Sequence, residues 1–271
     1  MNKSITVCIP TCLNNIDFFI ELMLSISNQT LLPDQIIIVL NGKNKNRKIF
    51  QKLICKVSKL IPKNINPEFF IADSFGLSHA RNIGIERCKT DILIFGDDDD
   101  IWDPNKIYLL HQTILKNGVC LVRHGFNNLG KNKIKRAPVK FKTNPNVFLI
   151  GIANYAGGGS SLSGSTCIFK TIKFNETLFS CEDWDFWLRA YLIGVPILNI
   201  KKELVTYRIH PDRMTKKLND LFIYEFLVRF KYFQKTIKFI FGLILGFLRS
   251  LLKYIFVIFP YGLIGRLNRN S

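Results

Sequence analysis

A short apolar run that ends in four consecutive carboxylates constrains this chain more than any other stretch. Ile92 to Phe95 has the length and composition of a buried strand, and Asp97 to Asp100 follow it after one glycine. Adjacent like charges repel one another, so we expect a positive partner here, and a hard divalent cation is the natural candidate. The alternative is a solvated acidic turn before a helix that begins at Asp103 and Pro104. A metal site is favoured, because such a turn needs only one or two aspartates.

The composition is that of a folded chain with a basic surface. With 48% hydrophobic and 13% aromatic residues, the sequence excludes a disordered protein. Its 271 residues suffice for one large α/β domain, or for a smaller domain with an appendage. The net charge of +18 is compatible with nucleic acid, an anionic membrane surface or phosphorylated substrates as partners. The basic residues are densest after His210, so the charge points first to the C-terminal part.

The cysteines and the N-terminus indicate a cytosolic protein. Most of the seven cysteines lie inside apolar runs and none forms a Cys-x-x-Cys pair, which favours buried thiols over disulfides or a zinc site. The N-terminus leads directly into the apolar segment from Ile5 to Pro10, without the basic region and long apolar core of a signal peptide. We therefore expect reduced cysteines and no signal peptide.

Strands and helices alternate along the first half of the chain. The patterns predict strands at 5–9, 35–40, 68–72, 91–95 and 119–125, and helices at 16–28, 43–60, 77–88 and 104–116. This alternation predicts an α/β fold with a mostly parallel sheet flanked by helices. Ligands bind such sheets beyond the carboxyl ends of the strands. Those ends should converge on one cleft, at Pro10–Thr11, Asn41–Gly42, Asp73–Ser74 and the acidic cluster Asp97–Asp100.

The second half is less regular. Residues 126–146 are basic and polar and are predicted to form a flexible surface connection. The glycine-rich stretch from Gly157 to Gly164 lacks the spacing of dinucleotide and P-loop motifs, and it is either a plain turn or an acceptor loop. Beyond it the patterns predict a strand at 165–170, a helix at 182–193, and strands at 196–200 and 204–209.

Six short motifs follow one another in a recognisable order between about residues 4 and 213. They are Ile9-Pro10-Thr11, Asn28-Gln29-Thr30, Gly76 to Asn82, the acidic cluster with Ile101 to Pro104, Glu182-Asp183-Trp184, and Tyr207 to His210. This series resembles the successive signatures of the family-2 inverting glycosyltransferases. The resemblance implies a GT-A domain over residues 1–213, a nucleotide-sugar donor, a divalent Mn or Mg ion, and transfer with inversion at the anomeric carbon.

The resemblance also assigns the donor side of the site. It places Pro10 and Thr11 beside the nucleotide and directs Arg81 to the nucleotide or its phosphates. Asp97 and Asp99 correspond to the Asp-x-Asp pair, with Asp99 as the main metal ligand. Asp97 and Asp98 would lie near the ribose and the metal.

Three further positions follow from the same resemblance. Asp183 corresponds to the catalytic base, with Glu182 orienting it or binding the acceptor. On local grounds alone, these acids would instead be first-turn residues of a helix capped by Ser180. His210 corresponds to a residue that approaches the metal or the diphosphate. Asn41 stands where many members carry an aspartate that binds the base, so the nucleotide is open, with a UDP-sugar favoured.

The C-terminal region, residues 214–271, is basic and apolar. Every charged side chain after Glu225 is positive, and a helix over 231–253 would align one narrow stripe of Lys231, Lys235, Lys238, Gly242, Gly246, Arg249 and Lys253. The uncharged runs 239–248 and 254–265 are too short to span a bilayer, which takes about 20 residues. We expect an amphipathic helix on an anionic membrane surface; the alternative is a helix packed on the domain or in an oligomer.

The readings differ in how much of the chain they use. A glycosyltransferase that acts on a lipid-linked or surface-polysaccharide acceptor, from the cytoplasmic face of the plasma membrane, uses the motifs and the tail together. A nucleotidyltransferase that makes sugar nucleotides would also have a parallel sheet and a metal site at its edge. This chain, however, lacks the glycine- and arginine-rich triphosphate loop that such an enzyme carries near its N-terminus. A nucleic-acid-binding protein rests on charge alone, and we expect no nucleic-acid partner.

Overall fold

The computed structural model describes most of the chain in one α/β fold. The described residues are 3–42, 47–63, 65, 67–129, 154, 158–208, 210, 218–233 and 237–253. The predicted surface connection therefore lies outside the described residues from residue 130 onward, as does the apolar run at 254–265.

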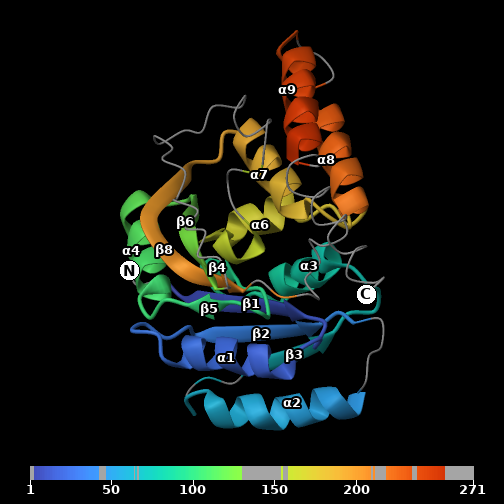
Figure 1. Cartoon of the computed structure of the whole chain (residues 1–271). Helices are drawn as coiled ribbons and strands as arrows, with labels where there is room; N and C mark the ends of the chain where they lie inside the picture. Colours follow the sequence, from blue (N-terminus) through green and yellow to red (C-terminus); the bar gives the residue numbers. More distant parts are fainter. Residues whose placement is uncertain are drawn as a thin grey trace, which may run out of the picture.

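An eight-stranded mixed sheet forms the centre of the described part (Figure 1). Its order is β3-β2-β1-β4-β7-β6-β8-β5. The first four strands in this order are parallel, β7 is antiparallel to β4 and β6, and β5 is antiparallel to β8. The strands are β1 (Ile5–Thr11), β2 (Gln35–Leu40), β3 (Glu68–Ile71), β4 (Ile92–Phe95), β5 (Ile101–Trp102), β6 (Leu121–Leu129), β7 (Ser163–Ser165) and β8 (Ile197–Arg208). The α/β prediction is confirmed: the pairs β3-β2, β2-β1, β1-β4 and β6-β8 are parallel.

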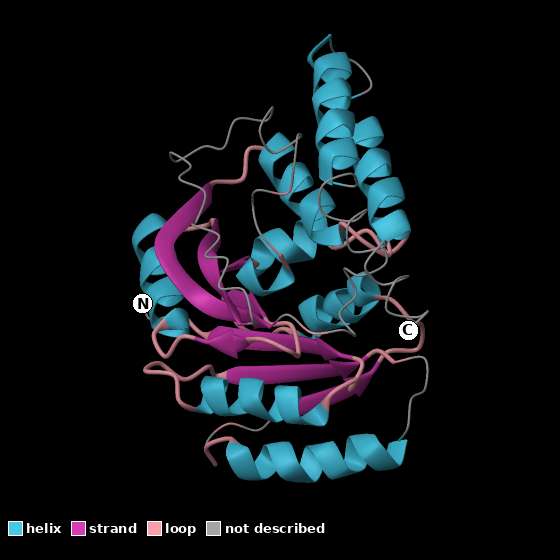
Figure 2. Ribbon diagram, in the orientation of Figure 1, coloured by secondary structure: helices cyan, strands magenta, loops and turns pink. Residues whose placement is uncertain are grey.

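Helices cover both faces of this sheet (Figure 2). One apolar cluster joins β1 and β2 to α1, α2 and α4, and a second joins the opposite faces of these strands to α3, α6 and α7. The helices are α1 (Ile16–Ser27), α2 (Arg47–Leu60), α3 (Leu77–Arg87), α4 (Lys106–Asn117), α6 (Thr166–Ile172), α7 (Glu182–Leu192), α8 (Leu218–Phe233) and α9 (Ile237–Lys253), with a 3-10 turn η1 at Gly159–Ser161.

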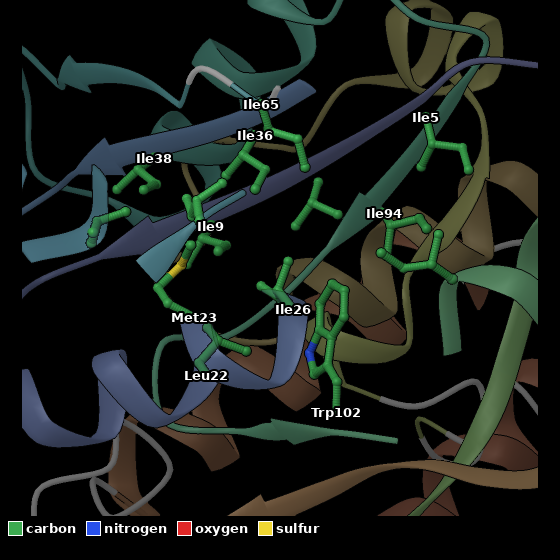
Figure 3. Packing of buried hydrophobic residues seen from close by; sticks show 14 of the residues in the cluster. Ile5, Ile9, Leu22, Met23, Ile26, Ile36, Ile38, Ile65, Ile94 and Trp102 are labelled. Atoms are coloured by element: carbon green, nitrogen blue, oxygen red, sulfur yellow. The ribbon is translucent and has the colours of Figure 1, made fainter. Parts of the chain in front are cut away.

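The two apolar clusters explain why β1, β2 and β4 have no polar face. Figure 3 shows one cluster, in which Ile9 of β1 and Ile36 and Ile38 of β2 lie with Leu22 and Met23 of α1. The intervening residues of the same strands belong to the second cluster. A strand buried on both faces reads as a continuous apolar run, which is how the sequence shows β1, β2 and β4.

Two predicted elements are wrong. Residues 166–170 belong to a helix, α6, and the predicted strand is limited to Ser165 at the end of β7. A short apolar run does not distinguish strand from helix by periodicity, although the buried Thr166 and Phe169 are three residues apart, as on one face of a helix. The strands predicted at 196–200 and 204–209 are one strand, β8, whose charged centre is exposed opposite a register shift in β6.

The C-terminal region forms two helices where one was predicted across 231–253. Helix α8 ends at Phe233 and α9 begins at Ile237, and the two lie side by side (Figure 1). Gly246 of α9 approaches Arg229 of α8 so closely that a Cβ at this glycine would lie 2.7 Å from Arg229 Nε. Gly246, part of the predicted stripe, is therefore a helix-packing position. Lys235, also in that stripe, lies outside the described residues.

Helix α8 is attached to α7 through a buried carboxylate. Asp185 is fully buried and accepts hydrogen bonds from Tyr232 Oη at 2.5 Å and from Lys231 Nζ at 3.3 Å, both on α8. Val228 packs with Trp184 and Leu188 of α7. The alternative of a C-terminal helix packed on the domain therefore holds for α8. The division of the chain at residue 213 stays a prediction.

Candidate active site

The carboxyl ends of the parallel strands meet at one edge of the sheet, as predicted. The backbone N–H of Asn41, just after β2, donates a 2.8 Å hydrogen bond to the backbone carbonyl of Thr11 at the end of β1. Asn41 Oδ1 accepts a 2.9 Å bond from the Gly76 amide at the start of α3. Thr11 Oγ1 donates to Asp98 Oδ2 at 2.5 Å. Pro10 is buried within β1 opposite Val39 and Thr11 is buried as well, so the partly exposed part of this end begins at Cys12.

Three of the four consecutive aspartates have different hydrogen-bond partners, and the fourth is buried. Asp97 faces Arg81, Asp98 faces Thr11, and Asp99 Oδ2 lies 2.8 Å from His210 Nε2. Asp100 points inward and is fully buried. The cluster is therefore divided among separate polar sites, and only part of it is accessible to a ligand.

Mutual repulsion and burial both act on this cluster. Burial raises the pKa of Asp98 to about 6, the neighbouring carboxylates add to the rise, and the Thr11 hydroxyl opposes it. Burial and the charge of Asp97 raise the pKa of Asp99, whereas His210 acts in the opposite direction. A bound cation would favour the charged forms of these carboxylates.

Two carboxylates of the acidic cluster are partly accessible and could contribute ligands to a metal ion. Asp97 and Asp99 have side chains that are 27% and 19% exposed. Across the described part of the chain, no group of three or more His, Cys, Asp and Glu side chains is arranged to hold a metal ion. A set of one or two carboxylates suits Mg²⁺ or Mn²⁺ in a site completed by substrate phosphates and water. The residues present thus fit the predicted ion.

Arg81 joins the acidic cluster to the start of α7. The fully buried guanidinium donates to Asp97 Oδ1 at 3.0 Å and to Glu182 Oε1 at 2.7 Å. Its carbon lies 5.2 Å from the centre of the Phe174 ring. Burial lowers the pKa of Arg81, but the charges of Asp97 and Glu182 outweigh burial and leave this pKa raised. The guanidinium is thus a fixed positive charge between two carboxylates.

Glu182 and Asp183 begin α7 beside this guanidinium. The helix has Cys181 as its N-cap, in a left-handed conformation with φ 61°, so the Ser180 cap is wrong. Asp183 Oδ1 accepts a 2.7 Å bond from the Trp184 amide, and Oδ2 accepts a 2.9 Å bond from Asn154 Nδ2. Both carboxylate oxygens are therefore oriented.

The environment of Asp183 favours its protonated form. Burial and the charge of Glu182 raise the pKa of Asp183 well above that of an ordinary carboxyl, and Arg81 opposes the rise. A carboxylate with a raised pKa is a better proton acceptor near neutral pH. The arrangement suits a general base.

The glycine-rich stretch lies against Arg81 and Asp97. A Cβ on Gly159 would lie 1.9 Å from Arg81 Nη2, so only glycine leaves room for the guanidinium. The Asp97 amide donates a 2.7 Å bond to Ser160 Oγ, and the Ser160 amide donates to Asp97 Oδ2 at 3.3 Å. A Cβ on Gly158 would lie 4.0 Å from Asp183 Oδ2. The turn therefore separates Asp97 from Asp183.

Sequence reasoning missed three of these contributors. The run of glycines marked the turn as unusual but did not show that Ser160 holds Asp97. Asn154 and Lys106 carry no local signal, because neither belongs to a motif of its own. The Lys106 Nζ donates a 2.9 Å hydrogen bond to the Ser160 carbonyl. Their roles depend on contacts between segments far apart in the chain.

Comparison with known proteins gives one family. The family model described as glycosyl transferase family 2 matches residues 6–167. A curated relative, the amylovoran biosynthesis glycosyltransferase AmsE of Erwinia amylovora, is 25% identical over 205 residues, which are 71% of each chain. Another is the UDP-Gal:alpha-D-GlcNAc-diphosphoundecaprenol beta-1,3-galactosyltransferase of Escherichia coli. It is 26% identical over 213 residues, or 74% of this chain and 72% of that protein.

The fold also matches solved structures. S. aureus TarS 1-349 in complex with UDP-GlcNAc superposes with a TM-score of 0.67 at 16% sequence identity, covering 93% of this chain and 73% of that one. The crystal structure of S. aureus TarS 1-349 gives a TM-score of 0.65 at 16% identity, with coverages of 94% and 72%. At these identities the likeness establishes the fold.

Proposed function

The chain belongs to glycosyl transferase family 2, and on this premise we propose that it transfers a sugar from a UDP-sugar to a hydroxyl of a lipid-linked or surface-polysaccharide acceptor. We further propose that the transfer inverts the anomeric carbon. The E. coli relative acts, by its name, from UDP-Gal on a diphosphoundecaprenol-linked sugar, and TarS has been solved with UDP-GlcNAc. Both support a UDP-sugar as donor here.

One observation carries this proposal: the Arg81 guanidinium bridges Asp97 and Glu182, with Asp183 next in the chain. The group that leaves in such a transfer is a nucleoside diphosphate, whose negative charge grows as the glycosidic bond breaks. A fixed cation at the carboxyl edge of the sheet stabilises that charge, and a carboxylate on the other side of the turn accepts the acceptor's proton. The proposal is supported by the turn between them, since Gly159 lies against Arg81 and a Cβ on Gly158 would lie 4.0 Å from Asp183 Oδ2.

We propose Mn or Mg as the cofactor, held by Asp99 with Asp97 and His210. When bound, the ion would neutralise the charge of the donor diphosphate. His210 Nε2 lies 2.8 Å from Asp99 Oδ2, so His210 either orients that carboxylate or would itself be a ligand of the ion. Thr11, Asn41 and Asp98 then line the nucleotide side of the site.

The experiment that tests donor and metal together is calorimetric titration with UDP, GDP, dTDP and CDP, in Mn²⁺ and in EDTA. We expect UDP to bind only with Mn²⁺, and we expect Asp99→Asn to weaken that binding at least about tenfold, because the variant removes an anionic oxygen ligand. Asp17→Asn removes an equal charge from the exposed start of α1 and should bind like the wild type. Equal UDP affinity with and without metal would contradict the metal proposal.

We also propose that the α8–α9 pair rests on an anionic membrane, at the cytoplasmic face of the plasma membrane. Many large apolar side chains on these helices are exposed: Ile223, Phe226, Leu227, Phe230, Ile244, Leu245, Phe247, Leu248, Leu251 and Leu252. An apolar surface of this size on a basic protein is typical of an interfacial site. Among the described helices, none has the length and apolar character to cross a bilayer. An acceptor confined to the membrane would make this placement useful.

A charge substitution on α9 tests the membrane surface. Ile244, Leu248 and Leu251 are exposed at helical spacing on one side of α9. Replacing all three by Glu should lower co-sedimentation with phosphatidylglycerol vesicles at least about tenfold, because apolar contact is lost and each added charge near the surface costs about 1 kcal/mol. The matched control replaces exposed Ile71, Val119 and Ile193 by Glu, away from α9. Equal loss in both variants, or no loss in either, would contradict the proposal.

A further inference from the structure

A lysine lies in the core directly behind the acidic cluster and has no part in the mechanism proposed above. Lys106 is the first residue of α4, yet its side chain is fully buried. Its Nζ lies 3.6 Å from the centre of the Trp102 ring and donates a 2.9 Å hydrogen bond to the Ser160 carbonyl. Burying an ammonium is costly, and the positive end of a helix adds to the cost. Specific contacts must compensate for a lysine in this place.

Ser160 connects Lys106 to the predicted donor site. The backbone amide and the hydroxyl of Ser160 are both hydrogen-bonded to Asp97. Asp97 in turn accepts the 3.0 Å bond from Arg81, and the neighbouring Gly159 lies against the same guanidinium. The amide and hydroxyl of Ser160 thus face the site while its carbonyl faces the core. Lys106 holds that carbonyl.

A buried carboxyl group lies in the same region as this lysine. Asp100 is fully buried, and burial together with the charges of Asp97 and Asp99 raises its pKa. Burial lowers the pKa of Lys106 to about 7, and the charges of Asp100 and Asp97 act in the opposite direction. Removing one member of such a set leaves the other charge uncompensated, whereas removing both is far less disruptive.

We propose that Lys106 is a positioning residue for the donor site: its hydrogen bond to Ser160 holds the η1 turn against Asp97, so that Asp97 and Arg81 are set in place before the nucleotide binds. The inference rests on the proposed function, because that function assigns Asp97 and Arg81 to the donor. Lys106 itself touches neither donor nor acceptor. Preorganised side chains of this kind need a supporting shell that locks them.

Three variants separate the effect of the Lys106 hydrogen bond from the effect of the Lys106 charge. Lys106→Met removes both the hydrogen bond and the charge. Lys106→Gln retains an N–H donor for the Ser160 carbonyl without the charge. Asp100→Asn combined with Lys106→Met removes both buried charges and still lacks the hydrogen bond, so it serves if the single variant fails to fold. Lys116→Met, at an exposed position on the same helix, is the matched control.

The first readout is amide hydrogen exchange in the full chain without ligand. In Lys106→Met, or in the double variant, exchange at the Asp97 and Ser160 amides should rise at least about tenfold. Opening of the η1 turn then no longer requires the hydrogen bond between Lys106 and the Ser160 carbonyl to break. Exchange in β1 and β2 should not change, and Lys106→Gln should restore much of the protection. A uniform rise across the sheet, or no local rise, would overturn the proposal.

The second readout is steady-state transfer, with separate KM values for donor and acceptor. The KM for the UDP-sugar should rise about tenfold or more in Lys106→Met, while the acceptor KM and the control variant stay at wild-type values. Equal effects on both KM values would show a general structural role and overturn the proposal. If the wild-type chain uses no nucleotide-sugar, the proposed function fails, and the exchange readout still decides whether Lys106 positions Asp97.

Discussion

Replacing Asp183 by Asn is expected to lower kcat by about 10²–10⁴-fold, the usual contribution of a positioned general base. The amide retains the size of the side chain and an oxygen for the Trp184 amide, but it cannot accept a proton at neutral pH. Since Asp183 does not contact Asp97 or Asp99 in the described hydrogen bonds, the KM for the donor should stay within about twofold. A loss in kcat alone is the sign of an interaction made in the transition state.

The pH dependence provides the second measurement for this variant. A base works in its deprotonated form, and burial and Glu182 raise the pKa of Asp183. Activity should therefore fall with decreasing pH, beginning above the range in which an ordinary carboxyl titrates. In Asp183→Asn the residual activity should lose this dependence. A variant that retains more than about a tenth of wild-type kcat, with the same acid limb, would show that another group is the base.

Replacing Arg81 by Met is expected to destabilise the protein by about 3–5 kcal/mol, which is typical when one partner of a buried ion pair is removed. The guanidinium is 1% exposed and donates to both Asp97 and Glu182. Without it, two carboxylates are left close together without their cation. Arg81→Lys should also be impaired, since one ammonium does not reproduce the planar fork that reaches both carboxylates.

Urea unfolding of three variants measures this effect. Arg87→Met changes an exposed arginine of the same helix, which lies 5.0 Å from the Phe70 ring, and should cost under about 1 kcal/mol. Adding Glu182→Gln to Arg81→Met should recover part of the loss, because it removes one of the orphaned charges. A cost below about 1 kcal/mol for Arg81→Met would contradict the bridging role.

The sequence predicts the parts of the fold that depend on local pattern. Apolar runs at β1, β2 and β4 read as strands because both faces of the sheet are covered. Their alternation with helices predicts that β1 to β4 are parallel, and chain order then places Thr11, Asn41 and the acidic cluster at one edge. The family motifs extended this reasoning to Arg81 and to the start of α7, which lie together in the structure.

The rest depends on contacts that no local pattern encodes. Ser160 and Asp97 are 63 residues apart, and Lys106 reaches Ser160 across 54 residues. The sequence of α6 predicts a strand, because six of its seven residues are apolar or β-branched and satisfy either pattern. The tail was read as a single amphipathic helix, whereas Gly246 serves the packing of α9 on α8. The hydrophobic periodicity of the C-terminal region does not reveal that α8 ends at Phe233 and α9 begins at Ile237.

A transfer assay tests the central proposal most directly. The full chain is incubated with UDP-glucose, UDP-galactose or UDP-GlcNAc and a diphosphate-linked lipid sugar in anionic vesicles, with Mn²⁺ or with EDTA. Released UDP and the anomeric configuration of the product are then measured. We expect acceptor-dependent release of UDP from one donor, loss of release in EDTA, and a product of inverted configuration. Absence of UDP release with every donor would contradict the UDP-sugar proposal, and a product that retains the donor's configuration would contradict Asp183 as the base of an inverting transfer.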